Sequence, residues 1–296
     1  MKSLVLPIAL AALLLPAPAQ AQQQRADPDF RPRVAAPAYP RAQGPRVSID
    51  EGHDNFHTAD GRYAPFAALL RADGYRVSGA NGWPASTLAQ TDILVIANLL
   101  TAPGDAEADA LREWVAGGGS LLLLADHAPF GSAAARLAAR FGVDMGQGYV
   151  VTQGAGGQRV TTTIDYEGAR LGRHPILAGR NGEERVRHVT AFTGQSLGAP
   201  AGATVLLQLP SDAFEVPGVP AVQALQRGER TSGRNVGTRA QGIAFPFGKG
   251  RVVVLGEAAM FSAQISVQGK PMGMNAPGND DRQFALNTLH WLSRAL

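Results

Sequence analysis

The chain has 296 residues, and its composition excludes several classes of protein and of site. It contains no cysteine, which rules out a disulfide framework, a thiolate zinc site, a lipoprotein anchor and a cysteine nucleophile. Five of its 27 Lys and Arg residues and two of its 24 Asp and Glu residues precede residue 46, so residues 46–296 carry 22 of each and are formally neutral. The basic pI is therefore no argument for a nucleic-acid partner, and we expect none.

Residues 1–21 have the pattern of a secretory signal peptide. Lys2 precedes an apolar run that ends in the A-x-A sequence Ala19-Gln20-Ala21, so we expect cleavage after Ala21 and a periplasmic or secreted protein. An uncleaved anchor is the alternative, but spanning needs roughly 20 apolar residues, and this run is short and interrupted by two prolines. We expect no transmembrane segment after signal cleavage.

Residues 22–45 carry five prolines and little that can pack, which predicts a disordered or extended tether. From residue 46 on, apolar runs alternate with amphipathic stretches, and the chain is long enough for one sizeable domain over residues 46–296. In chain order the pattern predicts a strand, helix, strand, strand, helix, strand and helix over residues 46–51, 62–74, 75–78, 92–98, 105–119, 120–127 and 131–142.

This order predicts an α/β fold, an open and mostly parallel sheet with helices on both faces. Residues 146–240 are rich in Gly, Thr and Val and predict an irregular β-rich insertion. Two strands joined by a Gly-Lys-Gly turn are expected over 241–257. An amphipathic helix closes the chain over 280–296, with Asp280 and Gln283 as a capping box.

Polar side chains follow four predicted strands at their carboxyl ends, where open parallel sheets bind ligands. We expect these side chains to meet at one edge of the sheet. We assign catalytic roles to Glu51, Asp126, His127 and Glu257, and ligand binding to Asp50, Asn55 and Asn98. Each residue also has a plainer interpretation: the acids are loop or helix-capping groups, and Asn55 is a turn residue.

His53 and His57 are four residues apart, so on one helical turn they would face one way and could chelate a divalent metal. Gly52 in the same segment weakens the expectation of a helix. For His174 a structural position at a turn is expected, and for His290 a solvated position on the last helix. His188 lies in the β-rich middle, and the sequence shows no partner for it. The remaining glycine-rich stretches lack the pattern of a phosphate-binding loop.

Three stretches carry a resemblance to a known family. The run "WVAGGGSLLLLADHAPF" resembles the central strand and elbow of the class I glutamine amidotransferase-like superfamily, including its ThuA-like branch. "KGRVVVLGEAAMFSAQ" and "GNDDRQFALNTLHWL" are similar to the ends of extracytoplasmic domains of gliding-motility and ABC-transporter auxiliary proteins. The resemblance implies a flavodoxin-like, glutamine amidotransferase-like sheet. It does not imply glutaminase activity, because the elbow reads Ala125-Asp126-His127 and the cysteine is missing.

Three functions remain open. One is a hydrolase, metal-assisted or acid/base, that acts on a cell-envelope or carbohydrate-type substrate. Another is a non-catalytic module that binds a glycan or a small-molecule ligand. The third is an envelope assembly or structural protein whose polar cluster only caps strand ends. The orientation of His53, His127 and Glu257 discriminates between the second and the third, because a ligand site requires these side chains to face one another.

Overall fold

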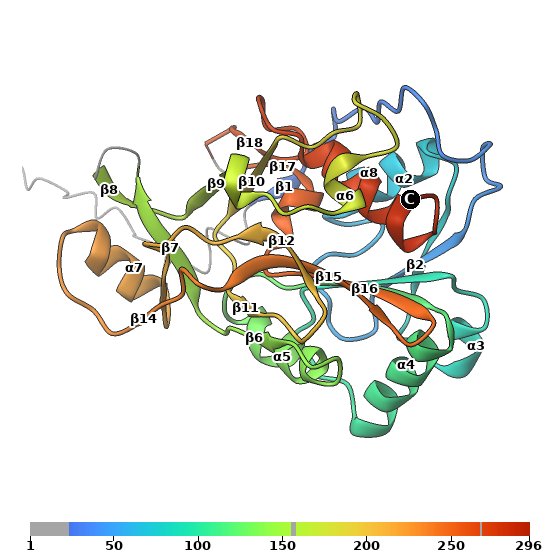
Figure 1. The fold of residues 1–296 in the computed structure, drawn as a ribbon, viewed down its shortest axis with the longest axis horizontal. Helices are drawn as coiled ribbons and strands as arrows, with labels where there is room; N and C mark the ends of the chain where they lie inside the picture. Colours follow the sequence, from blue (N-terminus) through green and yellow to red (C-terminus); the bar gives the residue numbers. More distant parts are fainter. Residues whose placement is uncertain (1–23, 155–157, 267) are drawn as a thin grey trace, which may run out of the picture.

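The computed structural model describes residues 24–154, 158–266 and 268–296, and its centre is one nine-stranded sheet (Figure 1). The strand order is β3-β2-β4-β5-β16-β15-β11-β6, and β12 pairs with β15. The parallel part consists of β3 (Arg76–Ala80), β2 (Arg46–Asp50), β4 (Ile93–Ala97), β5 (Ser120–Leu124) and β16 (Gly250–Leu255). The antiparallel part consists of β15 (Ala240–Phe247), β11 (Leu197–Gly198), β6 (Asp144–Met145) and β12 (Thr204–Gln208).

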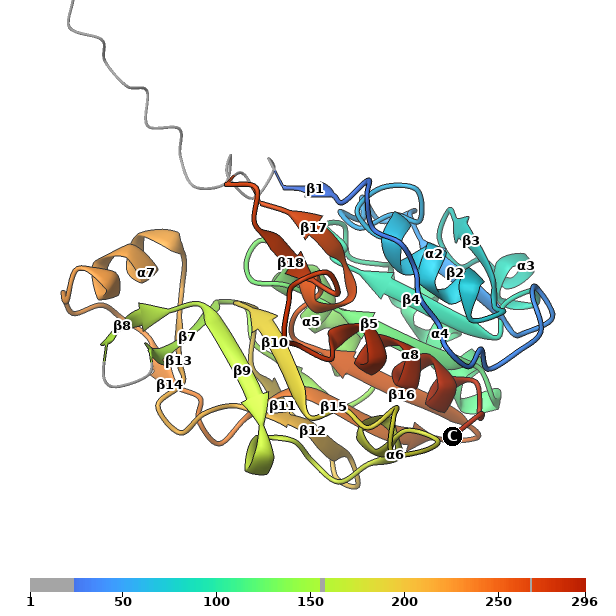
Figure 2. The same ribbon diagram turned by 90° about the horizontal axis from the view of Figure 1, so that it is seen from above.

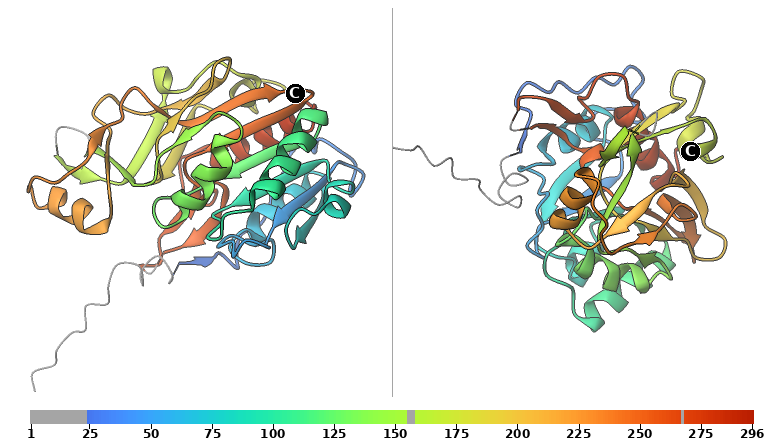
Figure 3. Two further views of the ribbon diagram at one scale, coloured as in Figure 1. Left: turned by 90° about the horizontal axis from the view of Figure 1, so that it is seen from below. Right: turned by 90° about the vertical axis from the view of Figure 1, so that its left-hand side faces the viewer.

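Helices cover both faces of this sheet, which confirms the predicted α/β class. Side chains of a fully buried strand alternate between faces, so Val95 of β4 joins the apolar cluster of α2 (Ala64–Ala72) and α8 (Asp281–Leu292). Its neighbour Ile96 joins the opposite cluster, with α4 (Asp105–Gly117), α5 (Phe130–Ala139) and α3 (Ala85–Leu88). Seen from below, α4 and α5 lie over the sheet (Figure 3). Within the described ranges no helix has the length and apolarity to cross a membrane.

The region 146–240 adds two small antiparallel sheets to the central one. One sheet contains β14 (Arg234–Asn235), β13 (Phe214–Val216), β7 (Tyr149–Gly154) and β8 (Gln158–Thr161), and the other pairs β9 (Thr163–Glu167) with β10 (His188–Phe192). Short helices also occur there, namely η1 (Gly168–Arg170), α6 (Pro175–Ala178) and α7 (Val219–Gln226). The predicted β-rich character is therefore present. The sheet of β7 and β13, together with α7, projects to one side of the molecule (Figure 1).

Residues 24–45 lie against the domain, which differs from the predicted tether. β1 (Arg25–Ala26) pairs with β17 (Ala263–Ile265), and β17 pairs with β18 (Pro271–Gly273), as Figure 2 shows. The short helix η2 (Ala259–Phe261) directly precedes β17. Phe30 is buried, and the Tyr39 ring packs edge-on against Tyr75 with 5.2 Å between centroids. A count of prolines misses these contacts, because a proline-rich segment without its own secondary structure can still pack onto an existing surface.

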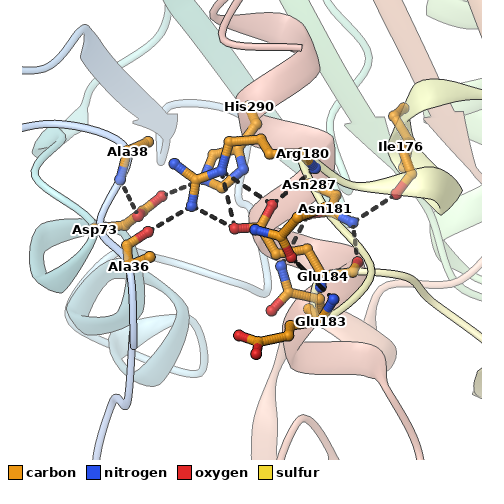
Figure 4. A network of polar contacts seen from close by, with 11 residues as sticks. Ala36, Ala38, Asp73, Ile176, Arg180, Asn181, Glu183, Glu184, Asn287 and His290 are labelled. Carbon is orange, nitrogen blue, oxygen red and sulfur yellow. Dashed lines mark hydrogen bonds and ion pairs between the residues drawn. The ribbon is translucent and has the colours of Figure 1, made fainter.

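A buried polar network holds the same segment in place (Figure 4). The Asp73 carboxylate accepts a hydrogen bond from the Ala38 amide at 2.7 Å and pairs with His290 Nε2 at 2.7 Å. Arg180 donates to the Ala36 carbonyl and pairs with Glu184. The prediction of a solvated His290 is therefore wrong: its side chain is 1% exposed, because α8 is buried around most of its circumference.

The predicted capping box at the start of α8 is also absent. Asp280 is the N-cap residue, but its side chain makes no capping hydrogen bond. Its carboxylate instead accepts the backbone N–H groups of Arg187 and His188, at 2.7 and 3.0 Å. Gln283 donates to Asn287 one turn further along the helix. The side chains of Asp280 and Gln283, which the local pattern assigned to a capping box, are thus used in other contacts.

Candidate functional site

The parallel strands bring the predicted polar residues to one edge of the sheet. Asp50 is the last residue of β2, Asn98 follows β4, Asp126 follows β5 by two residues, and Glu257 follows β16 by two residues. The strands are paired in parallel with matching register, for example Ala97 with Leu124, so their carboxyl ends coincide. The predicted convergence of these residues on one edge is therefore found in the fold.

Asn98 and Asp126 form the centre of the edge. The Asn98 side-chain amide donates to Asp126 Oδ2 at 2.7 Å and to His57 Nδ1 at 2.9 Å, and its carbonyl oxygen accepts the Asp126 backbone N–H at 2.7 Å. Asp126 Oδ1 accepts the Ala258 amide at 2.7 Å. Asn98 adopts a left-handed backbone conformation with φ 52°, which asparagine tolerates better than most residues. One buried amide thus ties together the loops after β2, β4 and β5.

The Asp126 carboxylate influences the ionisation of its neighbours. Burial lowers the pKa of Arg62, and the charge of Asp126 partly counteracts this effect. Burial raises the pKa of Tyr149, and Asp126 raises it further. The same charge contributes to the raised pKa values of Tyr63 and Glu257, again after burial. Asp126 is therefore the main local negative charge, and Arg62 is a nearby cation.

His57 is a neutral donor in this arrangement. Burial lowers its pKa to about 4, although Asp126 acts in the opposite direction. Because Nδ1 accepts from the Asn98 amide, the imidazole proton resides on Nε2. Nε2 is buried and has no hydrogen-bond partner among the described residues, while the ring lies edge-on to Tyr63 with 4.7 Å between centroids. Buried donors of this kind are usually satisfied by water or a ligand.

The two ring nitrogens of His127 differ in their contacts. Its ring stacks on Tyr149, with centroids 4.1 Å apart and planes 16° apart, and Nδ1 lies 2.8 Å from the Ala128 carbonyl oxygen. A carbonyl can only accept, so Nδ1 carries a proton, and in the neutral ring Nε2 is the free acceptor. The Tyr149 hydroxyl donates to the same carbonyl at 3.1 Å. His127 is half-buried, so this edge of its ring remains accessible.

A strip of rings continues from this pair along the edge. His127 lies 6.5 Å from Phe130, Phe130 lies 5.3 Å from Phe56, and the Arg62 guanidinium lies 4.1 Å above the Phe56 ring. We call Arg62, Phe56, Phe130, His127 and Tyr149 the aromatic strip. Phe130 is buried, whereas the other four are half-buried. The strip combines planar apolar faces with a cation and an imidazole, next to the Asp126 carboxylate.

Glu257 lies at the edge but supports the turn that follows it. Its two carboxylate oxygens accept the amides of Ala259 and Met260, at 2.8 and 2.7 Å, and the residue is 1% exposed. Burial raises its pKa well above the usual range, and the neighbouring Asp126 adds to this. The geometry therefore gives Glu257 a capping contact to η2 and no access to a substrate, in place of the predicted catalytic role.

The two histidines predicted to chelate a metal have separate partners. His53 Nδ1 lies 2.9 Å from Asp50, its Nε2 lies 3.3 Å from Glu107, and its ring stacks on Trp83 with 4.3 Å between centroids. Burial lowers its pKa, but these two carboxylates raise it to a net value above the ordinary one. In the described part of the chain no group of three or more His, Cys, Asp or Glu side chains is placed to hold a metal ion.

The remaining predicted residues build the loop after β2. Glu51 is exposed and accepts the Ala59 amide at 2.8 Å. The Asn55 side chain accepts the His53 amide at 3.0 Å and donates to the Ala97 carbonyl at 3.4 Å, which is the turn function considered for it. Asp50, 0% exposed, accepts the Gly52 amide in addition to its contact with His53. These three side chains shape the loop and do not line the aromatic strip. Of the three side chains whose orientation discriminates a ligand site, His53 is paired with Asp50 and Glu257 with the Ala259 and Met260 amides, which is the arrangement expected of a structural role. A ligand at this edge would therefore have to contact the aromatic strip.

Sequence reasoning missed Arg62, Tyr149 and Gln195. Arg62 falls in the stretch assigned to a helix, and Tyr149 and Gln195 come from the β-rich middle, with no motif around them. The Gln195 amide donates to the Asp126 carbonyl, and its own oxygen is buried without a partner among the described residues. Backbone hydrogen bonds between distant segments place Tyr149 and Gln195, since the Gln195 backbone amide donates to the Gly256 carbonyl and the Val150 amide to the Gly194 carbonyl. No local signal could therefore have identified them.

Comparison with known proteins identifies a family and several similar folds. The model of the family described as "Domain of unknown function (DUF4350)" matches residues 55–264. A search of the curated proteins finds no match. Among solved structures, the "mmIFT52 N-terminal domain" is 14% identical, with a TM-score of 0.58, over 84% of this chain and 97% of that one. At this identity the likeness shows the fold alone.

Putative ThuA-like proteins are also among the matching structures. A putative ThuA-like protein from Parabacteroides merdae is 11% identical, with a TM-score of 0.47, over 86% of this chain and 91% of that one. Another from Bacteroides uniformis is 14% identical, with a TM-score of 0.45, over 88% of this chain and 93% of that one.

Proposed function

Because this chain belongs to the DUF4350 family, whose function is unknown, we propose a function from its own site: an exported domain that binds a saccharide. The ligand would lie over the aromatic strip at the carboxyl edge of the sheet. The observation that carries the proposal is the combination of ring faces, the His127 Nε2 acceptor, the Arg62 cation and the Asp126 carboxylate within one surface strip. Sugars present both apolar C–H faces and hydroxyl groups, so they require this mixture of contacts.

The internal bonding of the acidic residues favours binding over catalysis. Glu257 caps a turn and Glu51 holds the Ala59 amide, so the carboxylates of both residues are engaged within the protein. Among the residues that the structure describes, no side chain occupies the nucleophile position after β5 with a base beside it. Ser132 is exposed and contacts only the Pro129 carbonyl, at 3.5 Å. The chain also has no cysteine, so it is not a cysteine-dependent glutaminase.

Hydrolysis is the second candidate, and one observation favours it. Nδ1 of His127 is fixed by the Ala128 carbonyl, which leaves Nε2 as a basic nitrogen that could accept a proton from water. The backbone carbonyl would then orient the imidazole as a carboxylate does in a catalytic triad. In this alternative His127 is the general base and Arg62 stabilises developing negative charge.

Export is part of the proposal. The predicted signal peptide, which lies outside the described residues, would deliver the domain to the periplasm or the exterior, where envelope saccharides are present. No nucleic-acid partner is proposed, because the formal charge of residues 46–296 is zero.

The test uses the mature chain, residues 22–296, titrated with soluble oligomers of N-acetylglucosamine and of glucose in a calorimeter. Binding is expected to be lost in His127→Ala and weakened in Tyr149→Ala, while Ser132→Ala, an exposed neighbour, serves as the matched control. Mass spectrometry of the same mixtures detects cleavage. Binding without cleavage supports the binding module, and cleavage lost in His127→Ala supports the hydrolase. Failure to bind any oligomer, or equal binding by all variants, contradicts both.

A further inference from the structure

A cavity lies away from the carboxyl edge, beside α6. It has a volume of about 770 Å³ and is lined by the loop from Gly168 to Ala178 and by residues 185–187. Three of the lining residues are arginines, Arg173, Arg185 and Arg187, and none is an aspartate or glutamate. A cavity with this lining concentrates positive potential on a chain whose residues 46–296 are formally neutral.

These arginines are not neutralised by contacts within the described structure. Arg187 donates only to the backbone carbonyls of Arg185 and Gly182, each at 3.4 Å. The side chains of Arg173 and Arg185 are exposed and make no hydrogen bond or ion pair with the residues described. Glu184, which precedes Arg185 in the chain, is paired with Arg180. Their guanidinium groups therefore remain available to an anion.

His174 adds a neutral donor to the same lining. Its Nδ1 accepts the Ile176 amide at 3.2 Å, so in the neutral ring the proton is on Nε2. Burial, with a contribution from Arg251, lowers its pKa to about 4, so the ring is neutral at physiological pH. Its edge-on contact with Trp291, 4.9 Å between centroids, holds the ring in place.

We propose that this cavity binds a phosphate group, either of a soluble ligand or of an anionic lipid headgroup. Guanidinium groups donate pairs of parallel hydrogen bonds to phosphate oxygens, and three of them with one imidazole N–H match the tetrahedral, negatively charged oxygens of a phosphate group. The proposal is independent of the saccharide site, since the cavity lining shares no residue with the aromatic strip.

The experiment compares the mature chain with the double variant Arg173→Gln/Arg185→Gln. Arg136→Gln is the matched control, because Arg136 is an exposed arginine on α5, on the other side of the sheet (Figure 1). Inorganic phosphate and pyrophosphate are titrated at low salt, and co-sedimentation is measured with phosphatidylcholine vesicles with and without phosphatidylglycerol. All three residues are exposed, so thermal unfolding should be unchanged by the substitutions.

We expect binding that weakens about tenfold or more in the double variant and not in Arg136→Gln. If the soluble anions bind in this way, the ligand is a soluble phosphate; if only the phosphatidylglycerol vesicles do, it is a lipid headgroup. Absence of binding to every probe overturns the proposal. Equal weakening in Arg136→Gln also overturns it, because it would indicate a general charge effect in place of a site.

Discussion

Asn98 and Asp126 exchange two hydrogen bonds, each of 2.7 Å, across the ends of the adjacent strands β4 and β5. The amide also holds His57, so a single uncharged side chain supports three loops of the carboxyl edge. The relationship requires an amide: a carboxylate in place of Asn98 could not donate to Asp126, and a hydrophobic residue could neither donate nor accept.

Replacement of Asn98 should therefore destabilise the domain both by the loss of hydrogen bonds and by backbone strain, and two variants separate these effects. Asn98→Ala removes the three hydrogen bonds and places alanine at φ 52°, so we expect a loss of about 2–4 kcal/mol in the free energy of unfolding. Asn98→Gly removes the same bonds but adopts this φ without strain, and we expect it to be about 1 kcal/mol less harmful. Denaturant unfolding measures both. Equal stability of the two variants would contradict the assigned backbone strain.

His57 should make the protein less stable in mild acid. Its pKa is about 4 in the folded state, below the ordinary 6.5, so between these values the unfolded chain binds the proton more readily. Stability is fully present above about 6.5 and decreases as the pH falls towards 4, by roughly 3 kcal/mol from this group. His57→Gln should reduce the slope of stability against pH in this window. A ring that titrates near 6.5 by NMR would refute the assignment.

His188 should have the opposite pH dependence. Burial lowers its pKa, but contacts with Asp165 at 2.9 Å, Gly278 and Glu167 raise it to a net value above 6.5. Its stabilising effect is present below about 6.5 and is lost as the pH rises through the folded-state pKa. His188→Gln should therefore be less stable than the wild type at about pH 6, and the difference should decrease above that pKa. Thermal unfolding across pH measures it, and a deficit that grows with pH would contradict the ion-pair assignment.

Glutamine cannot replace Glu257 without cost, because it offers only one acceptor oxygen to the two amides of Ala259 and Met260. Glu257 should also make stability depend on pH. Its raised pKa means that the stability it contributes is complete below about 4.5 and decreases as the pH rises towards the folded-state value. Glu257→Gln lacks this dependence, so its stability relative to the wild type should improve with rising pH. Glu257→Ala, which removes both amide contacts, should cost about 2–4 kcal/mol. Saccharide binding should be unchanged in Glu257→Gln, and loss of binding would restore a functional role to Glu257.

The sequence predicted the parts of the fold that depend on local patterns. The buried run of β5 and the amphipathic α2 follow from periodicity, and the position of Asp126 at a strand end follows from the geometry of parallel sheets. What failed depended on tertiary contacts. The pattern of the last helix predicts a solvated His290, because one helix alone cannot reveal that Asp73, itself bonded to the Ala38 amide, pairs with this ring.

The sequence predicted the edge of the sheet at which the candidate site lies, but it did not predict all the residues that form the site. Residue types at strand ends predicted that Asp126 and His127 lie at this edge, but they could not distinguish a side chain that faces a ligand from one that caps a turn, as Glu257 does. Tyr149 and Arg62 depend on long-range packing, since their contacts with His127 and Phe56 join segments with no common pattern.

The central claim is that the aromatic strip binds a saccharide through His127. The most direct measurement is an NMR titration of the histidine ring nitrogens with N-acetylglucosamine and glucose oligomers, in the wild type and in Tyr149→Ala. The account predicts a selective shift of the His127 Nε2 resonance, saturable in the wild type and weakened in the variant, while His174 and His290 do not shift. Saturable binding that leaves the His127 resonance unchanged, or no binding of either oligomer, would contradict it.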